Sequence, residues 1–146
     1  MSKFLSNLRQ VLSNPHANDG TGEWKLLSPL KYKSDLLQQT VVVYAGFTCD
    51  LASVPKIPGL YANFGNRYHR PAVVHDYLCR TKAVPRNIAD KVFLEAMRAQ
   101  NEEELGLLFG DEKADRAARL EGRAQAMYAA VVAYTLSGRW KDDYDA

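Results

Sequence analysis

The stretch Thr40-Val41-Val42-Val43-Tyr44-Ala45-Gly46 decides the fold, because its four β-branched residues and tyrosine favour an extended strand and Gly46 can end that strand. Two comparable runs precede it, at Trp24–Leu27 and Leu30–Tyr32, and turn-forming residues separate the runs. The pattern therefore predicts a small antiparallel sheet in the N-terminal half.

The C-terminal half has helical periodicity instead. Pro71 suits the start of a helix that runs to about Arg80, and a second helix is expected to begin near Arg86. A short helix over 101–109 and a long, alanine-rich helix capped by Asp111 follow. We therefore predict an α+β fold in which the sheet packs against three to four helices. The apolar face expected on the second helix consists of Ile88, Ala89, Val92, Phe93, Ala96 and Met97.

The chain is expected to form a single domain over residues 1–146. Residues 1–22 are predicted as an N-terminal helix to Ser13 and a flexible turn, because apolar residues recur at helical spacing before Asn14-Pro15. Residues 23–70 are predicted as the sheet and an ordered loop, residues 71–138 as the helical part, and residues 139–146 as an acidic tail.

Composition excludes several classes of protein. Of the 146 residues, 47% are hydrophobic and 25% are charged, which is typical of a soluble globular protein. A net charge of +2 without a basic run does not indicate a nucleic-acid partner, and no stretch is long enough to span a membrane. Two cysteines without CxxC spacing and no secretion signal favour a reducing cytoplasm.

Five polar residues lie beside sequence that should form the core: Asp50, Ser53, His75, Asp76 and Asp90. Burying imidazole or carboxylate groups is costly unless they are paired or bind a metal, so these five residues are the candidates for a functional site. The functional hypothesis is that the three aspartates and His75 hold a divalent metal ion that activates water, while Ser53 orients a substrate.

Each residue also has a structural interpretation. His75 can bond a backbone carbonyl while Asp76 caps a loop, and Asp90 can pair with Arg86 one turn back. Asp50 to Ser53 can form a hydrogen-bonded turn. Cys49 and Cys79 are expected to be buried apolar residues, although Cys79 lies at the i, i+4 spacing from His75 that zinc ligands use.

Several of these residues also belong to a wider pattern, which consists of Ala45-Gly46-Phe47, Asp50, Ala52-Ser53-Val54-Pro55, His75-Asp76-Tyr77-Leu78, Arg86, Ala89-Asp90, Val92-Phe93 and Ala96-Met97. In this order, they resemble a family of small proteins from tailed phages and prophages that has no assigned function. The resemblance covers Trp24 to Met97, and the chain departs from it at Tyr44, Cys49 and Cys79. It implies a phage origin, with the protein in the host bacterial cytoplasm or incorporated in the virion, and it implies no reaction.

Three functions follow as hypotheses. The first is a metal-dependent hydrolase that acts on cell-wall or phosphoester bonds. The second is a non-enzymatic virion, tail accessory or assembly protein, in which the polar residues form an internal hydrogen-bond network. The third is an inhibitor of a host defence system that acts by protein binding. The second and third imply phage or host proteins as partners.

Overall fold

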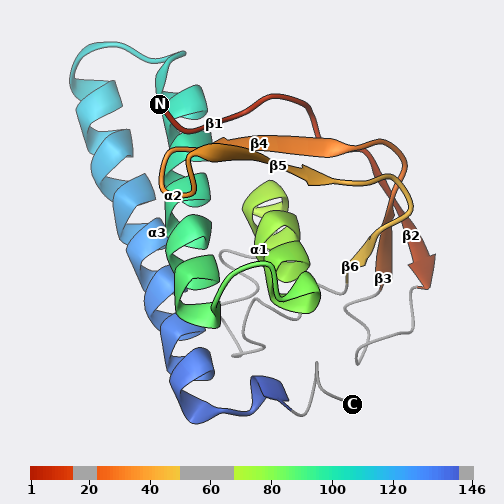
Figure 1. The fold of residues 1–146 in the computed structure, drawn as a ribbon. Helices are drawn as coiled ribbons and strands as arrows, with labels where there is room; N and C mark the ends of the chain where they lie inside the picture. Colours follow the sequence, from red (N-terminus) through yellow and green to blue (C-terminus); the bar gives the residue numbers. More distant parts are fainter. Residues whose placement is uncertain (15–22, 50–67, 142–146) are drawn as a thin grey trace.

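The computed structural model describes residues 1–14, 23–49 and 68–141, and the strands of this part form two antiparallel three-stranded sheets (Figure 1). One sheet has the order β1-β4-β5 and the other has the order β2-β3-β6. The predicted α+β class is therefore confirmed, with the sheet divided in two. The strands are β1 (Lys3–Phe4), β2 (Gln10–Asn14), β3 (Glu23–Leu26), β4 (Leu30–Ser34), β5 (Gln39–Val43) and β6 (Thr48–Cys49).

Strand β4 shows why this region forms a sheet. Its residues alternate between buried and exposed, so Leu30, Tyr32 and Ser34 face the core while the two lysines between them face solvent. β5 pairs with β4 in a register that places Val43 opposite Leu30 and Val41 opposite Tyr32. One face of the sheet is thus apolar and available for the helices.

The predicted N-terminal helix is wrong, because this segment forms β1 and β2. The Phe4 ring lies 4.7 Å from the Tyr32 ring in the core. Leu5, Val11 and Leu12 remain 47%, 45% and 39% exposed, so the apolar spacing does not form a buried helical face. Pairing with β3 and β4, which lie far along the chain, overrides the local pattern.

The helices are α1 (His69–Thr81), α2 (Arg86–Leu105) and α3 (Gly110–Ser137). The short helix predicted over 101–109 is wrong, because 101–105 continue α2 and 106–109 form the turn before α3. Phe109 takes the N-cap position of α3 in extended conformation, so Asp111 lies in the first turn, where its charge still favours the helix dipole.

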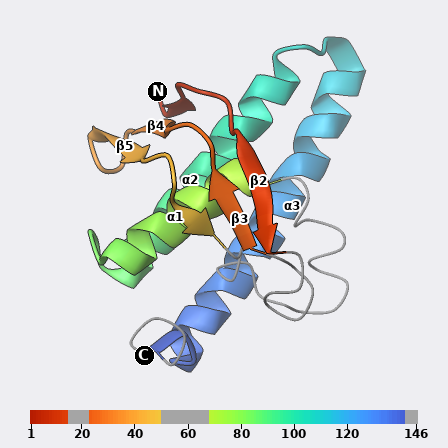
Figure 2. The same ribbon diagram turned by 90° about the vertical axis from the view of Figure 1, so that its right-hand side faces the viewer.

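Helix α2 is the centre of the molecule. It packs between α1 and α3 and also touches β1 and β4, while α1 contacts β5 and β6 (Figure 2). The apolar face predicted for α2 is confirmed from Ala89 to Met97, since five of its six members are fully buried and Ile88 is partly buried. Sheet and helices share one hydrophobic cluster.

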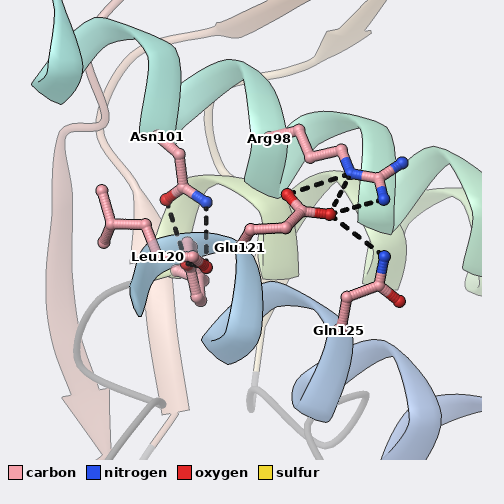
Figure 3. Close-up of polar contacts among 6 residues, drawn as sticks. Arg98, Asn101, Leu120, Glu121 and Gln125 are labelled. Atoms are coloured by element: carbon pink, nitrogen blue, oxygen red, sulfur yellow. Dashed lines mark hydrogen bonds and ion pairs between the residues drawn. The ribbon is translucent and has the colours of Figure 1, made fainter. Parts of the chain in front are cut away.

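Polar contacts fix α2 against α3 (Figure 3). The Tyr68 hydroxyl donates to Oδ1 of Asn101 at 2.9 Å, and Nδ2 of Asn101 donates to the Leu120 carbonyl at 3.3 Å. At the surface, Arg98 forms an ion pair with Glu121 at 2.6 Å. The Asn101 amide therefore lies in the buried part of the contact between α2 and α3, and the Arg98–Glu121 ion pair lies at its exposed edge.

Glu95 connects α2 to the sheet. Its Oε1 accepts hydrogen bonds of 2.7 Å from both the Tyr32 and Ser34 hydroxyls, and its Oε2 accepts the Leu36 N–H at 2.8 Å. Burial and the hydrogen bond to Glu95 raise the pKa of Tyr32. A single carboxylate thus ties α2 to β4 and to the turn that follows it.

Three predicted features fall on residues outside the described part of the chain. They are the turn over 18–22, most of the loop over 50–70, and the acidic tail from residue 142 onward. Among the helices that the structure does describe, none is both long and apolar enough to cross a membrane.

Candidate functional site

His75 on α1 and Asp90 on α2 meet in the interior. The imidazole Nε2 lies 2.7 Å from Oδ1 of Asp90, and the two side chains are only 0% and 2% exposed. The Phe93 ring packs beside the imidazole, with ring centroids 5.2 Å apart. Sequence analysis expected these two groups to converge, and the structure brings them into direct contact away from bulk water.

Helix α3 completes this contact through Thr135. The threonine hydroxyl donates to Oδ2 of Asp90 at 2.6 Å, so both oxygens of the carboxylate are engaged. Arg86 Nε in turn donates to the Thr135 hydroxyl oxygen at 3.2 Å. We call His75, Asp90, Thr135 and Arg86 the helix-linking network, because its members join all three helices.

Cys79 extends this network toward the surface. Its Sγ lies 3.6 Å from Nε2 of His75, which is the i, i+4 contact that the spacing predicts. Cys79 also lines a cavity of about 460 Å³ between the end of α1 and the start of α2. We call this the α1–α2 cavity, and its other lining residues are Lys82, Ala83, Val84, Pro85, Arg86 and Trp140.

The network favours a charged imidazole. Burial by itself would lower the pKa of His75, but the hydrogen bond to Asp90, the contact with Cys79 and the attraction of Asp90 together raise that pKa to about 9. His75 and Asp90 therefore form a buried ion pair at neutral pH. Removing one partner of such a pair leaves an uncompensated buried charge, which typically costs about 3–5 kcal/mol.

Asp76 takes part in a different contact. Its Oδ2 lies 3.3 Å from Nε of Arg80, one turn further along α1. Arg80 also donates from Nη1 to the Thr48 carbonyl at 2.9 Å. Asp76 thus helps to hold β6 against α1, and its ion pair with Arg80 involves no member of the helix-linking network.

The predicted metal site is not assembled by the described residues. Within residues 1–14, 23–49 and 68–141, no three His, Cys, Asp or Glu side chains lie close enough together to hold a metal ion. Asp50 and Ser53, the other members of the predicted site, lie outside the described residues. The Nδ1 atom of His75 is buried and has no hydrogen-bond partner within the described part.

Comparison with known proteins places the chain in a family. A model described as protein of unknown function (DUF1353) matches residues 24–106, which is more than half of the chain. The chain belongs to this family. The match includes His75, Asp76 and Asp90, and it ends before α3, so Thr135 lies beyond it. Neither the curated proteins nor the solved structures give a match.

Sequence reasoning missed two residues that matter to this arrangement, Thr135 and Glu95. Thr135 is a hydroxyl residue in the apolar C-terminal half of an alanine-rich helix, and Glu95 is a carboxylate between apolar positions of α2. The same signal identified Asp90: a polar group at the edge of an apolar helical face needs a buried partner. The same rule, applied to every polar residue beside an apolar helical face, also selects Thr135 and Glu95.

Proposed function

We propose that this DUF1353 chain acts without catalysis, as a virion or assembly accessory protein of phage type that binds other proteins. In this proposal, the polar residues stabilise the arrangement of the helices. The observation that carries it is the contact between His75 and Asp90, which is buried and in which Thr135 engages the remaining carboxylate oxygen. A water-activating centre needs an open coordination position or an accessible base, and this network offers neither to solvent.

The burial of the network also supports the proposal by its energetics. A buried network can favour a single packing arrangement where its polar groups are satisfied, as both carboxylate oxygens of Asp90 are. Here it connects three helices, and α2 is further tied to the sheet by Glu95. A rigid scaffold of this kind suits a small protein that presents a fixed surface to a neighbour.

Metal analysis of the purified protein tests the proposal. We expect no stoichiometric metal in the wild-type protein, in Asp50→Ala or in Asp90→Asn. Asp90→Asn should lower the unfolding temperature, whereas Lys91→Gln, at the adjacent exposed position of α2, should not. Stoichiometric metal that Asp50→Ala removes while the unfolding temperature stays unchanged would contradict the non-catalytic function.

A second experiment addresses the virion or assembly role. Particles and assembly intermediates of the phage or prophage that encodes the chain would be purified and analysed by quantitative mass spectrometry. We expect the protein at a fixed number of copies relative to the structural proteins in one of these fractions. Absence from both fractions would contradict this role.

One observation favours the hydrolase as a second candidate. The unpartnered Nδ1 of His75 leaves one nitrogen of a buried imidazole for a ligand or for a residue beyond the described part. The metal analysis separates the two functions, because only the hydrolase requires Asp50 and His75 to bind the same ion.

A further inference from the structure

The outer face of the β1-β4-β5 sheet carries three exposed lysines on neighbouring strands. Helices α1 and α2 pack against the other face of this sheet (Figure 1). The residues of β4 that alternate with its buried ones are Lys31 and Lys33, so both point away from the helices. Lys3 of β1 lies directly opposite Lys33 in the register. Positive charge therefore gathers on one side of the sheet.

These lysines are not neutralised by carboxylates. Within the described part of the chain, no carboxylate forms an ion pair with Lys3, Lys31 or Lys33. Asp35 attracts Lys33, but its carboxylate lies 3.2 Å from the amino group of Met1, which is the main cause of its lowered pKa. The one acidic group at this end of the sheet is thus already compensated.

The arrangement of the lysines costs stability. Lys3 and Lys33 are directly opposite each other, and like charges in this position repel. Lysines on an edge strand can serve to prevent pairing with another chain, which accounts for Lys3 on β1. That explanation does not apply to Lys31 and Lys33, because β4 has a neighbouring strand on both sides. An anionic partner would relieve the repulsion.

Strand alternation hides this charge in the sequence. Tyr32 separates Lys31 from Lys33, and Lys3 is far away along the chain, so no basic run appears. Residues 1–14 and 23–49 contain five Lys or Arg and two Asp or Glu, which gives a net charge of +3, while the whole chain carries +2. The surplus belongs to the sheet half of the molecule.

An exposed aromatic side chain adjoins the lysines. Val41 and Val43 of β5 are buried, so Tyr44, the next residue, continues the alternation on the outer face, and it is 66% exposed. We call Lys3, Lys31, Lys33 and Tyr44 the basic sheet face. Lysines for phosphates and an aromatic ring for a base are the combination that binds single-stranded nucleic acid.

Other anionic partners fit this face less well. Anionic bilayers are bound by clusters of about four to eight basic residues, and this face has three lysines. A duplex is read by a helix or a two-stranded ribbon in its groove, whereas this face is a broad three-stranded sheet. An acidic protein segment attracts lysines but offers no base to stack on Tyr44.

We propose that the basic sheet face binds a short stretch of single-stranded nucleic acid, with the three lysines on phosphates and the Tyr44 ring on a base. This activity goes beyond the proposed function and does not depend on it. Phosphate contacts and stacking read little sequence, so the binding has little sequence preference. Three phosphate contacts on a single strand give a slope of about −2 for log K against log salt concentration.

Fluorescence anisotropy of a labelled, mixed-sequence single-stranded DNA of about 10 nucleotides tests the proposal with the full-length chain. Between about 50 and about 200 mM salt, the affinity should fall about 20-fold. Lys3→Gln, Lys31→Gln and Lys33→Gln should each weaken binding and make the slope shallower by about 0.7. Lys113→Gln removes the same charge at an exposed position of α3 and is the matched control, which should bind as the wild type.

Tyr44 separates stacking from charge. Tyr44→Ala should weaken binding by at least about fivefold with the salt slope unchanged, whereas Tyr44→Phe, which keeps the ring, should bind as the wild type. Lys3→Gln and Lys33→Gln should not lower the unfolding temperature, because each removes a repulsive contact. Loss of binding in these variants therefore does not result from unfolding.

Several results would overturn the proposal. They are a wild type that fails to bind at the lowest salt concentration, a salt slope that the three sheet lysines do not change, a loss in Lys113→Gln equal to theirs, and full binding by Tyr44→Ala. Duplex DNA, polyglutamate and phosphatidylserine vesicles serve as competitors at equal charge. Each should compete at least tenfold less well than unlabelled single-stranded DNA, and equal competition by any of them would also overturn it.

Discussion

Stability should fall as the pH rises from 6.5 to 9, because His75 is protonated in the folded protein over this range and neutral in the unfolded chain. Its pKa rises from 6.5 in the unfolded chain to about 9 in the fold. A group with a raised folded pKa contributes stability that is complete below its unfolded pKa and is lost as the pH passes its folded pKa. One pKa unit corresponds to about 1.4 kcal/mol, so the loss should approach about 3 kcal/mol.

Asp90→Asn is the perturbation that isolates this effect. The amide cannot hold the imidazolium, and burial then favours the neutral ring, so the stability of the variant should not depend on His75 between pH 6.5 and 9. The difference between the wild-type and variant free energies of unfolding should therefore shrink by about 3 kcal/mol across the window. For a domain of this size, the wild type should lose roughly 10 °C in unfolding temperature relative to the variant.

Urea unfolding at several pH values provides the assay, since it yields the free energy of unfolding under each condition. The window begins at pH 6.5 because of His69, whose pKa is lowered by burial. The stability that its neutral ring contributes is complete above the unfolded pKa and is lost at lower pH, so measurements below pH 6.5 would also report on His69. Parallel pH profiles of wild type and Asp90→Asn from pH 6.5 to 9 would refute the buried ion pair.

The other predictions concern the contacts that hold α2 in place. Glu95→Ala should lower the free energy of unfolding by about 3 kcal/mol, because the buried Tyr32 hydroxyl loses its acceptor. Asn101→Ala should cost about 2 kcal/mol, since the Tyr68 hydroxyl loses its 2.9 Å bond to the amide. Glu121→Ala removes a half-exposed ion pair with Arg98 and an exposed hydrogen bond from Gln125, and it should cost less than about 1 kcal/mol. Urea unfolding of all three variants measures these values, and equal losses would contradict this ranking.

The sequence predicts the parts of this fold that local pattern determines. The alternation in β4 and the apolar face of α2 match the surfaces that are buried. The N-terminal segment is different, because the spacing of Phe4, Leu5 and Leu8 resembles that of a helix. Whether such a segment becomes a strand depends on pairing with β3 and β4, and this pairing cannot be recognised from the periodicity of the segment itself.

The candidate site, like the fold, was predictable only where the local sequence pattern determines it. Asp90 at the edge of an apolar face implied burial and a partner, and the structure supplies both. That His75 is the partner, and that Thr135 on α3 takes the second oxygen, depends on how three helices cross. Asp76 is predicted as a member of the same site; it lies about 100° around the helix from His75 and forms an ion pair with Arg80, while Asp50 and Ser53 lie outside the described residues.

The structural role of the helix-linking network depends most on the charge state of the His75 imidazole, which ¹⁵N NMR of the side chain reports directly. At about pH 7.5, between the unfolded and folded pKa values, both ring nitrogens should be protonated, and added Zn²⁺ or Mn²⁺ should leave their signals unchanged. A neutral ring whose signals shift or broaden on addition of metal would show that His75 is a ligand, and the structural role of the network would be wrong.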